Sequence, residues 1–284
     1  MVDQPVPIPD HTAERVALWR AMHIQIDSSP HIFTDEIGFQ LVNPDSGWQK
    51  RPDMDPKGTS GFRASIVSRA RFVEDVLLDQ IPLGVKQYVI LGAGLDTFAQ
   101  RRPDIGSKLV IFEIDQLGPQ LWKINRLKEL DFSIPDWLRF VPVNFETDSW
   151  WEQLLNSGFD TTKLSVISSL GVSMYISKEA TMETLQNIAS LPSGSVFVMT
   201  YMLPLELIEP EDQPSLAFSM KGAAASGTPF ISFYTPNEIK TLAQQAGFKT
   251  IKLISTTTLR EKYFVNRKDG LRLASGEGIL VATT

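Results

Sequence analysis

VILGAGLDT, residues 89–97, runs from a continuous apolar segment into a tight glycine turn. Near-continuous apolar runs are typical of strands that are covered on both faces of a parallel sheet. Open α/β sheets bind nucleotides at the carboxyl ends of their strands, where glycine lets the backbone approach a ligand closely. We therefore expect Gly92, Ala93 and Gly94 to bind a cofactor, although a turn that needs only a positive φ would show the same pattern.

Short apolar runs alternate with helical stretches around this turn, which is the pattern of βαβ units in a parallel sheet. The two final strands are separated by about 22 residues without a convincing helix, so we expect them to pair antiparallel. The sequence thus predicts an α/β fold on a mostly parallel sheet. The expected strands are residues 87–91, 108–114, 139–143, 165–169, 195–201, 248–255 and 278–283, and the expected core helices are residues 96–101, 116–130, 147–157, 178–189 and 236–246.

A helical cap is expected over residues 1–83, followed by the core over residues 84–284. The segment at residues 43–61 is rich in Pro, Gly and Asp, which predicts a loop or a mobile flap within the cap. The core is interrupted at residues 202–234, and long connections of this kind are usually lids or substrate walls. The expected helices of the cap are residues 12–24, 34–41 and 62–80.

A pair of acids ends the second expected strand, about 20 residues after the glycine turn. Strand alternation places Glu113 and Asp115 on the same side, and an acid here binds both ribose hydroxyls in dinucleotide folds. Alternatively, Asp115 only caps the helix that follows. Because Thr97 stands where the dinucleotide pattern has its third glycine, a nucleoside without phosphates is favoured over a pyrophosphate.

An arginine interrupts the apolar stripe of the last cap helix. At 100° per residue, Arg69 lies in the middle of this stripe, whereas Arg71 points the opposite way. A core-facing guanidinium needs a carboxylate, which belongs either to the protein or to the amino-acid moiety of a ligand. A nucleoside that lacks phosphates and carries an amino-acid carboxylate describes S-adenosylmethionine.

Several motifs occur together in one order along the chain. VILGAGLDT is followed by FEID at residues 112–115, LGVSMYIS at 170–177 and GTPFISFYTPNE at 227–238, and it is preceded by HTAERVALWRA at 11–21. With these motifs the chain resembles the leucine carboxyl methyltransferase-like family of S-adenosylmethionine-dependent methyltransferases. Within that family it is similar to the bacterial branch of polyketide-type O-methyltransferases.

This resemblance implies a class I methyltransferase fold, with a Rossmann-like seven-stranded sheet whose last strand is antiparallel. It also implies S-adenosyl-L-methionine as the cofactor. By position, Arg69 would hold the methionine carboxylate and residues 92–94 would pass under the cofactor. Asp115 would bind the ribose, with Glu113 in reserve.

Two positions depart from the family's pattern. The family usually has an Asp-Leu pair near the adenine, and Asn144-Phe145 stands here; the amide oxygen of Asn144 can still accept a hydrogen bond from the adenine amino group. Relatives that methylate protein carboxyl termini carry Glu where this chain has Leu170, just before Gly171. Backbone contacts to the cofactor can survive this change, but a role that needs the Glu side chain cannot.

The expected substrate is a small molecule that is methylated on a hydroxyl or carboxyl oxygen. The sulfonium already activates the methyl group, so the protein mainly aligns donor and acceptor and excludes water. A hydroxyl acceptor would benefit from a general base. Candidate catalytic residues are Tyr175, Tyr201 and His23, although packed tyrosine rings with satisfied hydroxyls are a common alternative.

Composition narrows the remaining classes of function. The 33 acidic and 27 basic residues leave a net charge of -6, which disfavours a nucleic-acid partner. The chain has no cysteine, and its three histidines all lie in the first 31 residues, so we expect no metal site. No apolar run reaches the roughly 18 to 20 residues that span a bilayer, and the polar start is no secretory signal. We expect a cytoplasmic protein that does not bind membranes; its oligomeric state is open.

Two other functions agree with part of this pattern. An NAD(P)-dependent oxidoreductase would use a similar sheet, but Thr97 and the helix-free final crossover disfavour it. A regulatory protein that binds the cofactor without turnover would tolerate Asn144 and Leu170 more easily.

Overall fold

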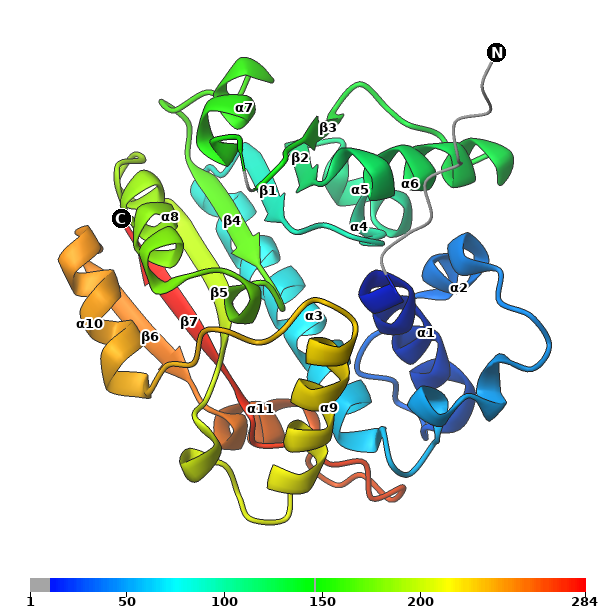
Figure 1. Ribbon diagram of the computed structural model, residues 1–284. Coiled ribbons are helices and arrows are strands. Elements are labelled where there is room, and N and C mark those ends of the chain that lie inside the picture. The colour runs from blue at the N-terminus through cyan, green and yellow to red at the C-terminus, as the bar shows by residue number, and fades with distance from the viewer. Residues whose placement is uncertain (1–10, 146) are drawn as a thin grey trace.

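Seven strands form one sheet in the order β3-β2-β1-β4-β5-β7-β6 (Figure 1). The computed structural model describes residues 11–145 and 147–284. Strands β1 to β5 pair in parallel, and β7 runs antiparallel to both β5 and β6. This topology confirms the expected class I fold. The strands are β1 Gln87–Leu91, β2 Val110–Asp115, β3 Leu138–Pro142, β4 Ser165–Ser169, β5 Val196–Met202, β6 Thr250–Ile254 and β7 Glu277–Thr283.

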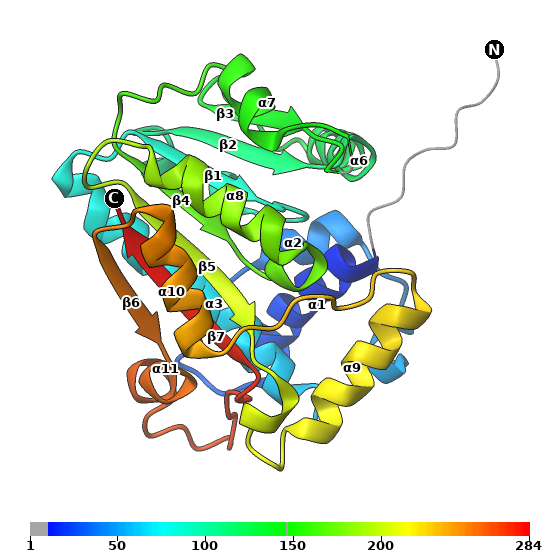
Figure 2. The ribbon, with the colours of Figure 1, turned by 60° about the vertical axis from the view of Figure 1, so that its left-hand side comes forward.

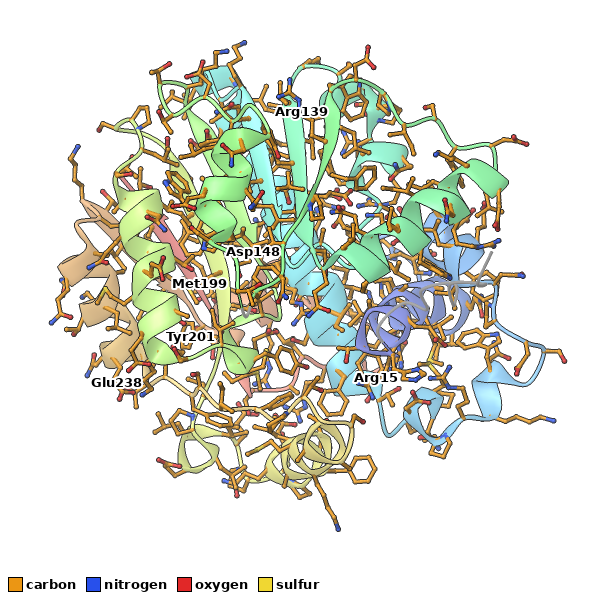
Figure 3. The ribbon with its side chains drawn as sticks, turned by 45° about the horizontal axis from the view of Figure 1, so that its top comes forward. Arg15, Arg139, Asp148, Met199, Tyr201 and Glu238 are labelled. Atoms are coloured by element: carbon orange, nitrogen blue, oxygen red, sulfur yellow. The ribbon has the colours of Figure 1, made fainter. Side chains whose placement is uncertain are left out.

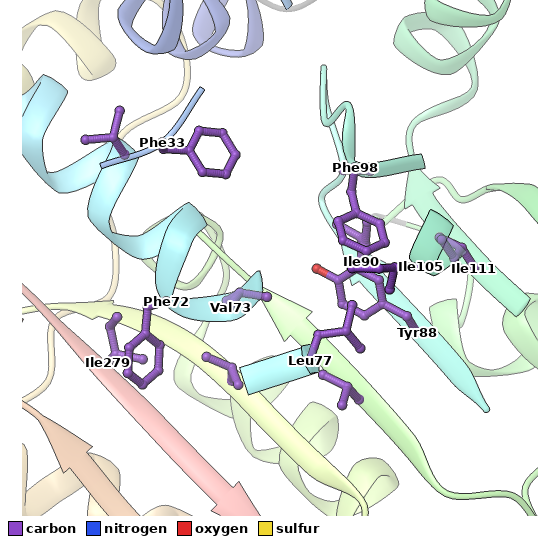
Figure 4. Close-up of a cluster of buried hydrophobic side chains, with 14 of the residues drawn as sticks. Phe33, Phe72, Val73, Leu77, Tyr88, Ile90, Phe98, Ile105, Ile111 and Ile279 are labelled. Atoms are coloured by element: carbon purple, nitrogen blue, oxygen red, sulfur yellow. The ribbon is translucent and has the colours of Figure 1, made fainter. Parts of the chain in front are cut away.

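Helices cover both faces of the sheet, so its strands alternate between two apolar clusters. In β1, Tyr88 and Ile90 face a cluster with α3, α4 and α5, shown in Figure 4. Val89 and Leu91 face the other cluster, with α7, α8 and α10. Figure 2 shows α8 and α10 in front of the sheet and α3 behind it. These helices are α3 Ser60–Gln80, α4 Phe98–Arg101, α5 Pro103–Gly106, α7 Trp150–Asn156, α8 Lys178–Ala189 and α10 Pro236–Ala246, while α6 Leu117–Glu129 packs on β3.

The N-terminal helices pack against one another and against the core. Helix α1 (His11–Ile26) contacts α2 (Glu36–Val42) and α3. The segment expected to be a loop or a flap forms two short 3-10 turns, η1 (Trp48–Lys50) and η2 (Pro52–Met54). Its buried Trp48 and Met54 pack on Leu18 and Met22 of α1, so apolar contacts hold this segment in place.

The expectation of a helix-free final crossover is wrong. Helix α11 (Thr256–Tyr263) follows β6, and Ser255 caps it by accepting a hydrogen bond from the Thr258 amide. Three threonines in succession disfavour a helix by intrinsic propensity. The cap and the burial of Leu259 against the sheet override that preference.

Other strand and helix boundaries differ from the expected ones by one to three residues. The helix expected from residue 96 begins at Phe98, because the Asp96 side chain accepts a hydrogen bond from the Phe98 amide in the preceding turn. The helix expected from residue 147 begins at Trp150, after a cap from Ser149. β1, β4, α8 and α10 have the expected bounds.

The interruption at residues 202–234 contains η5 (Leu205–Leu207) and α9 (Gln213–Ala225). Figures 1 and 2 place α9 and α1 at the end of the sheet toward which the arrows of β4 and β5 point. Both elements are therefore near the edge where α/β sheets bind ligands. Among the described helices, none is at once long and apolar enough to cross a membrane.

Gly278 of β7 tests the packing of the sheet. A Cβ atom at this position would lie 2.6 Å from Cζ of Tyr201 on β5, so Gly278→Ala should displace a buried ring. We expect it to lower the free energy of unfolding by about 1 to 3 kcal/mol in chemical denaturation. Gly222→Ala in α9 is the control, because nothing lies within 4 Å of its Cβ position. The control should be stabilised by about 0.5 to 1 kcal/mol, and equal losses would contradict the packing argument.

Candidate functional site

The glycine turn after β1 is closely approached from two sides. Gly92 and Gly94 have φ of 69° and 49°, a region that side chains rarely adopt. A Cβ at Gly92 would lie 2.5 Å from Cγ2 of Val172, and one at Gly94 would lie 3.2 Å from Cβ of Ala13 in α1. The Gly92 and Ala93 amides donate to the Ile114 carbonyl, at 2.9 and 3.1 Å. The turn is therefore fixed to β2 and leaves bare backbone at the carboxyl edge of the sheet.

Asp115 stands at the end of β2, directly beside this turn. Its carboxylate accepts hydrogen bonds from the Gly94 amide at 2.5 Å and the Gln116 amide at 2.7 Å. The second bond is made by the residue that precedes α6. The structure thus brings Asp115 and Gly94 together at one point of the sheet edge.

Glu113 does not reach this point. It is 1% exposed and pairs with Lys123 of α6, which is equally buried. Burial raises the pKa of Glu113 to about 7; the charge of Lys123 opposes this effect, and that of Asp96 adds to it. Its Oε1 atom has no hydrogen-bond partner in the described structure. A carboxylate enclosed in this way does not suit the reserve role of ribose ligand, because a diol cannot reach it.

Arg69 lies beneath the turn that follows β4. Its Nη1 atom donates to Glu277 of β7 at 2.7 Å, and Ser65 donates to the other oxygen of Glu277 at 2.6 Å. The carboxylate required by this arginine is thus supplied by the protein. Its Nη2 atom lies 2.7 Å from the Cβ position of Gly171, which has φ of 69°. Glycine at position 171 therefore makes room for the guanidinium. Arg71 is exposed and pairs with Asp75, in agreement with the predicted helical phase.

The other predicted cofactor contacts lie along the same edge. Asn144 and Phe145 follow β3, and the Phe145 ring is 41% exposed. The Asn144 amide donates to the Asp148 carboxylate at 3.1 Å. Leu170 packs against the apolar cluster behind the sheet, so its backbone rather than its side chain is available at the edge. These residues follow neighbouring strands of one parallel sheet and so share one rim.

The three catalytic candidates have different surroundings. Tyr175 is half-buried and packs edge-on against Phe230, with ring centroids 5.4 Å apart. Tyr201 is buried at the carboxyl end of β5, and burial raises its pKa to about 12 (Figure 3). Its hydroxyl therefore keeps its proton at neutral pH.

His23 is fully buried in α1, with both ring nitrogens engaged. Nδ1 lies 2.7 Å from the Asp27 carboxylate, and Nε2 accepts from the Ile32 amide at 3.0 Å. Asp27 is further held by Arg63 at 2.7 Å. The geometry gives His23 a structural role in the loop after α1 and does not bring it to the sheet edge.

Sequence reasoning missed Arg20, which ties α1 to the glycine turn. Its Nη2 atom donates to the Leu95 carbonyl at 2.6 Å, and its Nε atom donates to Asp35 at 2.7 Å. Burial alone would raise the pKa of Asp35, but the charges of Arg20 and Arg101 hold it below the ordinary value. Arg20 follows Ala13 and Ala17 at helical spacing, and that small-residue face was the available signal. Among residues 11–145 and 147–284, no group of three His, Asp or Glu side chains could hold a metal ion.

Two sequence comparisons extend over much of the chain. A family model described as leucine carboxyl methyltransferase matches residues 13–189. YktD of Bacillus subtilis (strain 168) is 34% identical over 279 residues, which cover 90% of this chain and 91% of YktD. YktD is named as an inferred S-adenosyl-L-methionine-dependent methyltransferase.

Solved structures are similar in fold. A DUF574 family protein of Streptomyces avermitilis superposes with a TM-score of 0.61 at 14% identity, covering 97% of this chain and 98% of its own. A protein of Thermobifida fusca YX, described as an inferred methyltransferase, superposes with a TM-score of 0.57 at 13% identity. The match covers 99% of this chain and 96% of the other. At these identities the likeness supports the fold alone.

The buried Glu113 predicts a pH dependence of stability. A carboxyl group whose pKa is raised in the folded state binds its proton more tightly there than in the unfolded chain. The contribution of Glu113 to the free energy of unfolding is therefore complete below its ordinary pKa of 4.5, and it is lost as the pH rises through about 7. When the pH is raised from about 5 to 8, the free energy of unfolding of the wild-type protein should fall by roughly 1 to 3 kcal/mol relative to that of Glu113→Gln, as measured in urea titrations. The exposed Glu261→Gln should keep the wild-type slope; a wild-type slope in Glu113→Gln would refute the assignment.

Proposed function

Since this chain belongs to the leucine carboxyl methyltransferase family and is an S-adenosylmethionine-dependent methyltransferase, we propose that it methylates a hydroxyl or carboxyl oxygen of a small molecule. Family membership sets aside the nicotinamide-dependent alternative. The observation that carries our cofactor assignment is the bare turn at Gly92 and Gly94 in contact with Asp115. It offers backbone groups and one carboxylate, which suits the hydroxyls of a nucleoside.

Each end of the cofactor has a matching group along the rim. We assign the ribose hydroxyls to Asp115, whose two oxygens can accept from a diol. We assign the adenine to Asn144 and the exposed ring of Phe145, since aromatic faces stack on bases. The backbone of Leu170 and Gly171 then faces the methionine end of the cofactor.

Arg69 is assigned to the methionine carboxylate in addition to Glu277. A guanidinium has five N–H donors, and among the described residues Arg69 donates only to Glu277. The Nη2 atom lies close to Gly171 and donates to no described residue, so its N–H groups remain for a second carboxylate. Glu277, itself held by Ser65, fixes the orientation of Arg69, so the guanidinium is already positioned to bind a second carboxylate.

S-adenosylmethionine supplies a methyl group that its sulfonium already activates, so the chain must position the acceptor and exclude water. Because Tyr201 keeps its proton, its hydroxyl can orient an acceptor oxygen as a donor but cannot remove a proton from it. The packing of Tyr175 against Phe230 provides an apolar wall. We assign the acceptor side to the described part of the N-terminal unit, residues 11–83, and to the insertion at residues 202–234.

Methyl transfer from radiolabelled S-adenosylmethionine to a panel of small hydroxy and carboxy compounds tests this function. Base-labile products identify methyl esters, and stable products identify ethers. Asp115→Ala should weaken cofactor binding by roughly ten- to a hundred-fold in isothermal titration, because it removes charge-assisted hydrogen bonds. Asp104→Ala, which removes a carboxylate exposed elsewhere, should leave it unchanged. Transfer to nitrogen or carbon acceptors alone would overturn the proposal of O-methylation.

The two arginines of α3 provide a matched pair. Arg69→Gln should lower the affinity for S-adenosylmethionine by roughly ten-fold or more, because the carboxylate loses its charged partner. Arg71→Gln should have no effect, since Arg71 is exposed and pairs with Asp75. Titrations on variants with native circular dichroism decide between them. Equal losses would remove Arg69 from the cofactor site.

A further inference from the structure

Arg15 differs from every other arginine in the described part of the chain. It forms no hydrogen bond or ion pair there, although its side chain is half-buried on α1. The other arginines each donate to a carboxylate or a carbonyl. They are Arg20, Arg51, Arg63, Arg69, Arg71, Arg101, Arg102, Arg126, Arg139, Arg260, Arg267 and Arg272.

An aromatic platform holds Arg15 in place. Its guanidinium carbon lies 5.7 Å from the ring centroid of Trp19, which is within the range of a cation–π contact. Trp19 in turn stacks on Phe62 of α3, with centroids 5.7 Å apart and planes inclined by 17°. The indole nitrogen donates to the Asp53 carbonyl at 3.0 Å, which fixes the ring. Both rings are half-buried, so the platform keeps accessible apolar surface beside a positive charge.

This platform lies on the acceptor side of the rim. Ala13, in the same first part of α1 as Arg15, lies beside the glycine turn, because a Cβ at Gly94 would be 3.2 Å from its Cβ. Arg15 projects from the other side of the helix, so it lies about one helix diameter from this turn. Phe62 precedes Arg69 by seven residues, which places both on one face of α3. Figure 3 shows Arg15 between α1 and α9, the helix of the insertion. The platform therefore lies near the rim, in the N-terminal unit that we assign to the acceptor.

Among the described residues, the neighbouring acids do not satisfy this charge. Glu14 and Asp53 both pair with Arg51, at 2.7 Å each. Arg15 thus keeps its donors for a ligand. A guanidinium binds carboxylates and phosphates through paired N–H groups, and partial burial strengthens such bonds by excluding water.

We propose that Arg15 and the Trp19–Phe62 stack form a recognition site for a methyl acceptor that carries a carboxylate or phosphate on a flat apolar body. The inference rests on the proposed function, because it places the acceptor beside the cofactor. The anionic group binds Arg15, and the apolar body lies against the aromatic rings. Arg15 therefore selects the acceptor and does not take part in methyl transfer.

Three probes with one ring system test this site. Protein loaded with S-adenosylhomocysteine is titrated with 2-naphthoate, 2-naphthyl phosphate and 2-naphthol, and tryptophan fluorescence is followed. The anions should bind roughly ten- to a hundred-fold more tightly than the neutral naphthol. The tighter of the two anions identifies the native group as a carboxylate or a phosphate.

Variants of Arg15 test whether the preference for anionic probes depends on its guanidinium. Arg15→Gln should abolish it, Arg15→Lys should restore part of it, and Arg71→Gln on the outer face of α3 should keep it. Thermal unfolding of each variant checks its fold. Equal binding of the three probes by wild type, or an unchanged preference in Arg15→Gln, overturns the proposal.

Titration with S-adenosylhomocysteine separates this inference from the proposed function. Normal cofactor binding by wild type and Arg15→Gln, without any preference for anions, refutes the anion site alone. A wild-type protein that fails to bind S-adenosylhomocysteine refutes the cofactor assignment instead.

Discussion

The turns after β1 and β4 are packed so tightly that side chains lie directly against the backbone of glycine residues. Val172 lies so close to Gly92 that a Cβ there would be 2.5 Å from it, and Arg69 approaches Gly171 in the same way. Both glycines adopt positive φ, so steric crowding and backbone conformation impose the same requirement. This constraint leaves a bare backbone rim at the carboxyl ends of the central strands, and the cofactor assignments all depend on that rim.

Charged groups support the rim from below. Arg20 joins the Leu95 carbonyl to the buried Asp35, so the N-terminal helices and the glycine turn share one ion pair. Arg69 joins α3 to Glu277 at the start of β7. Buried pairs of this kind are costly to break, because each leaves an uncompensated charge. They couple the N-terminal helices to the glycine turn and to the sheet.

The side that we assign to the acceptor differs in character from the rim that we assign to the cofactor. Met174, Met202, Ile208 and Leu216 form an apolar cluster where the insertion meets η4 (Ser173–Tyr175) and β5. Methionine side chains adapt their shape easily, so this wall can fit several apolar bodies. In our proposal, Arg15 adds a single charge to an acceptor site whose other contacts are apolar. On this proposal, selection of the acceptor depends on a few residues of α1 and the insertion, outside the sheet.

The sequence by itself determined the α/β class, the strands β1 and β4, the helices α8 and α10, and the glycine turn with Asp115 beside it. These features follow from local periodicity and from the conformational freedom of glycine, which are written in neighbouring residues. Only the tertiary structure decided that Glu113 is enclosed with Lys123, that His23 is fully engaged and that α11 forms after β6. Partners for buried polar groups come from segments distant in sequence, so no local pattern specifies them.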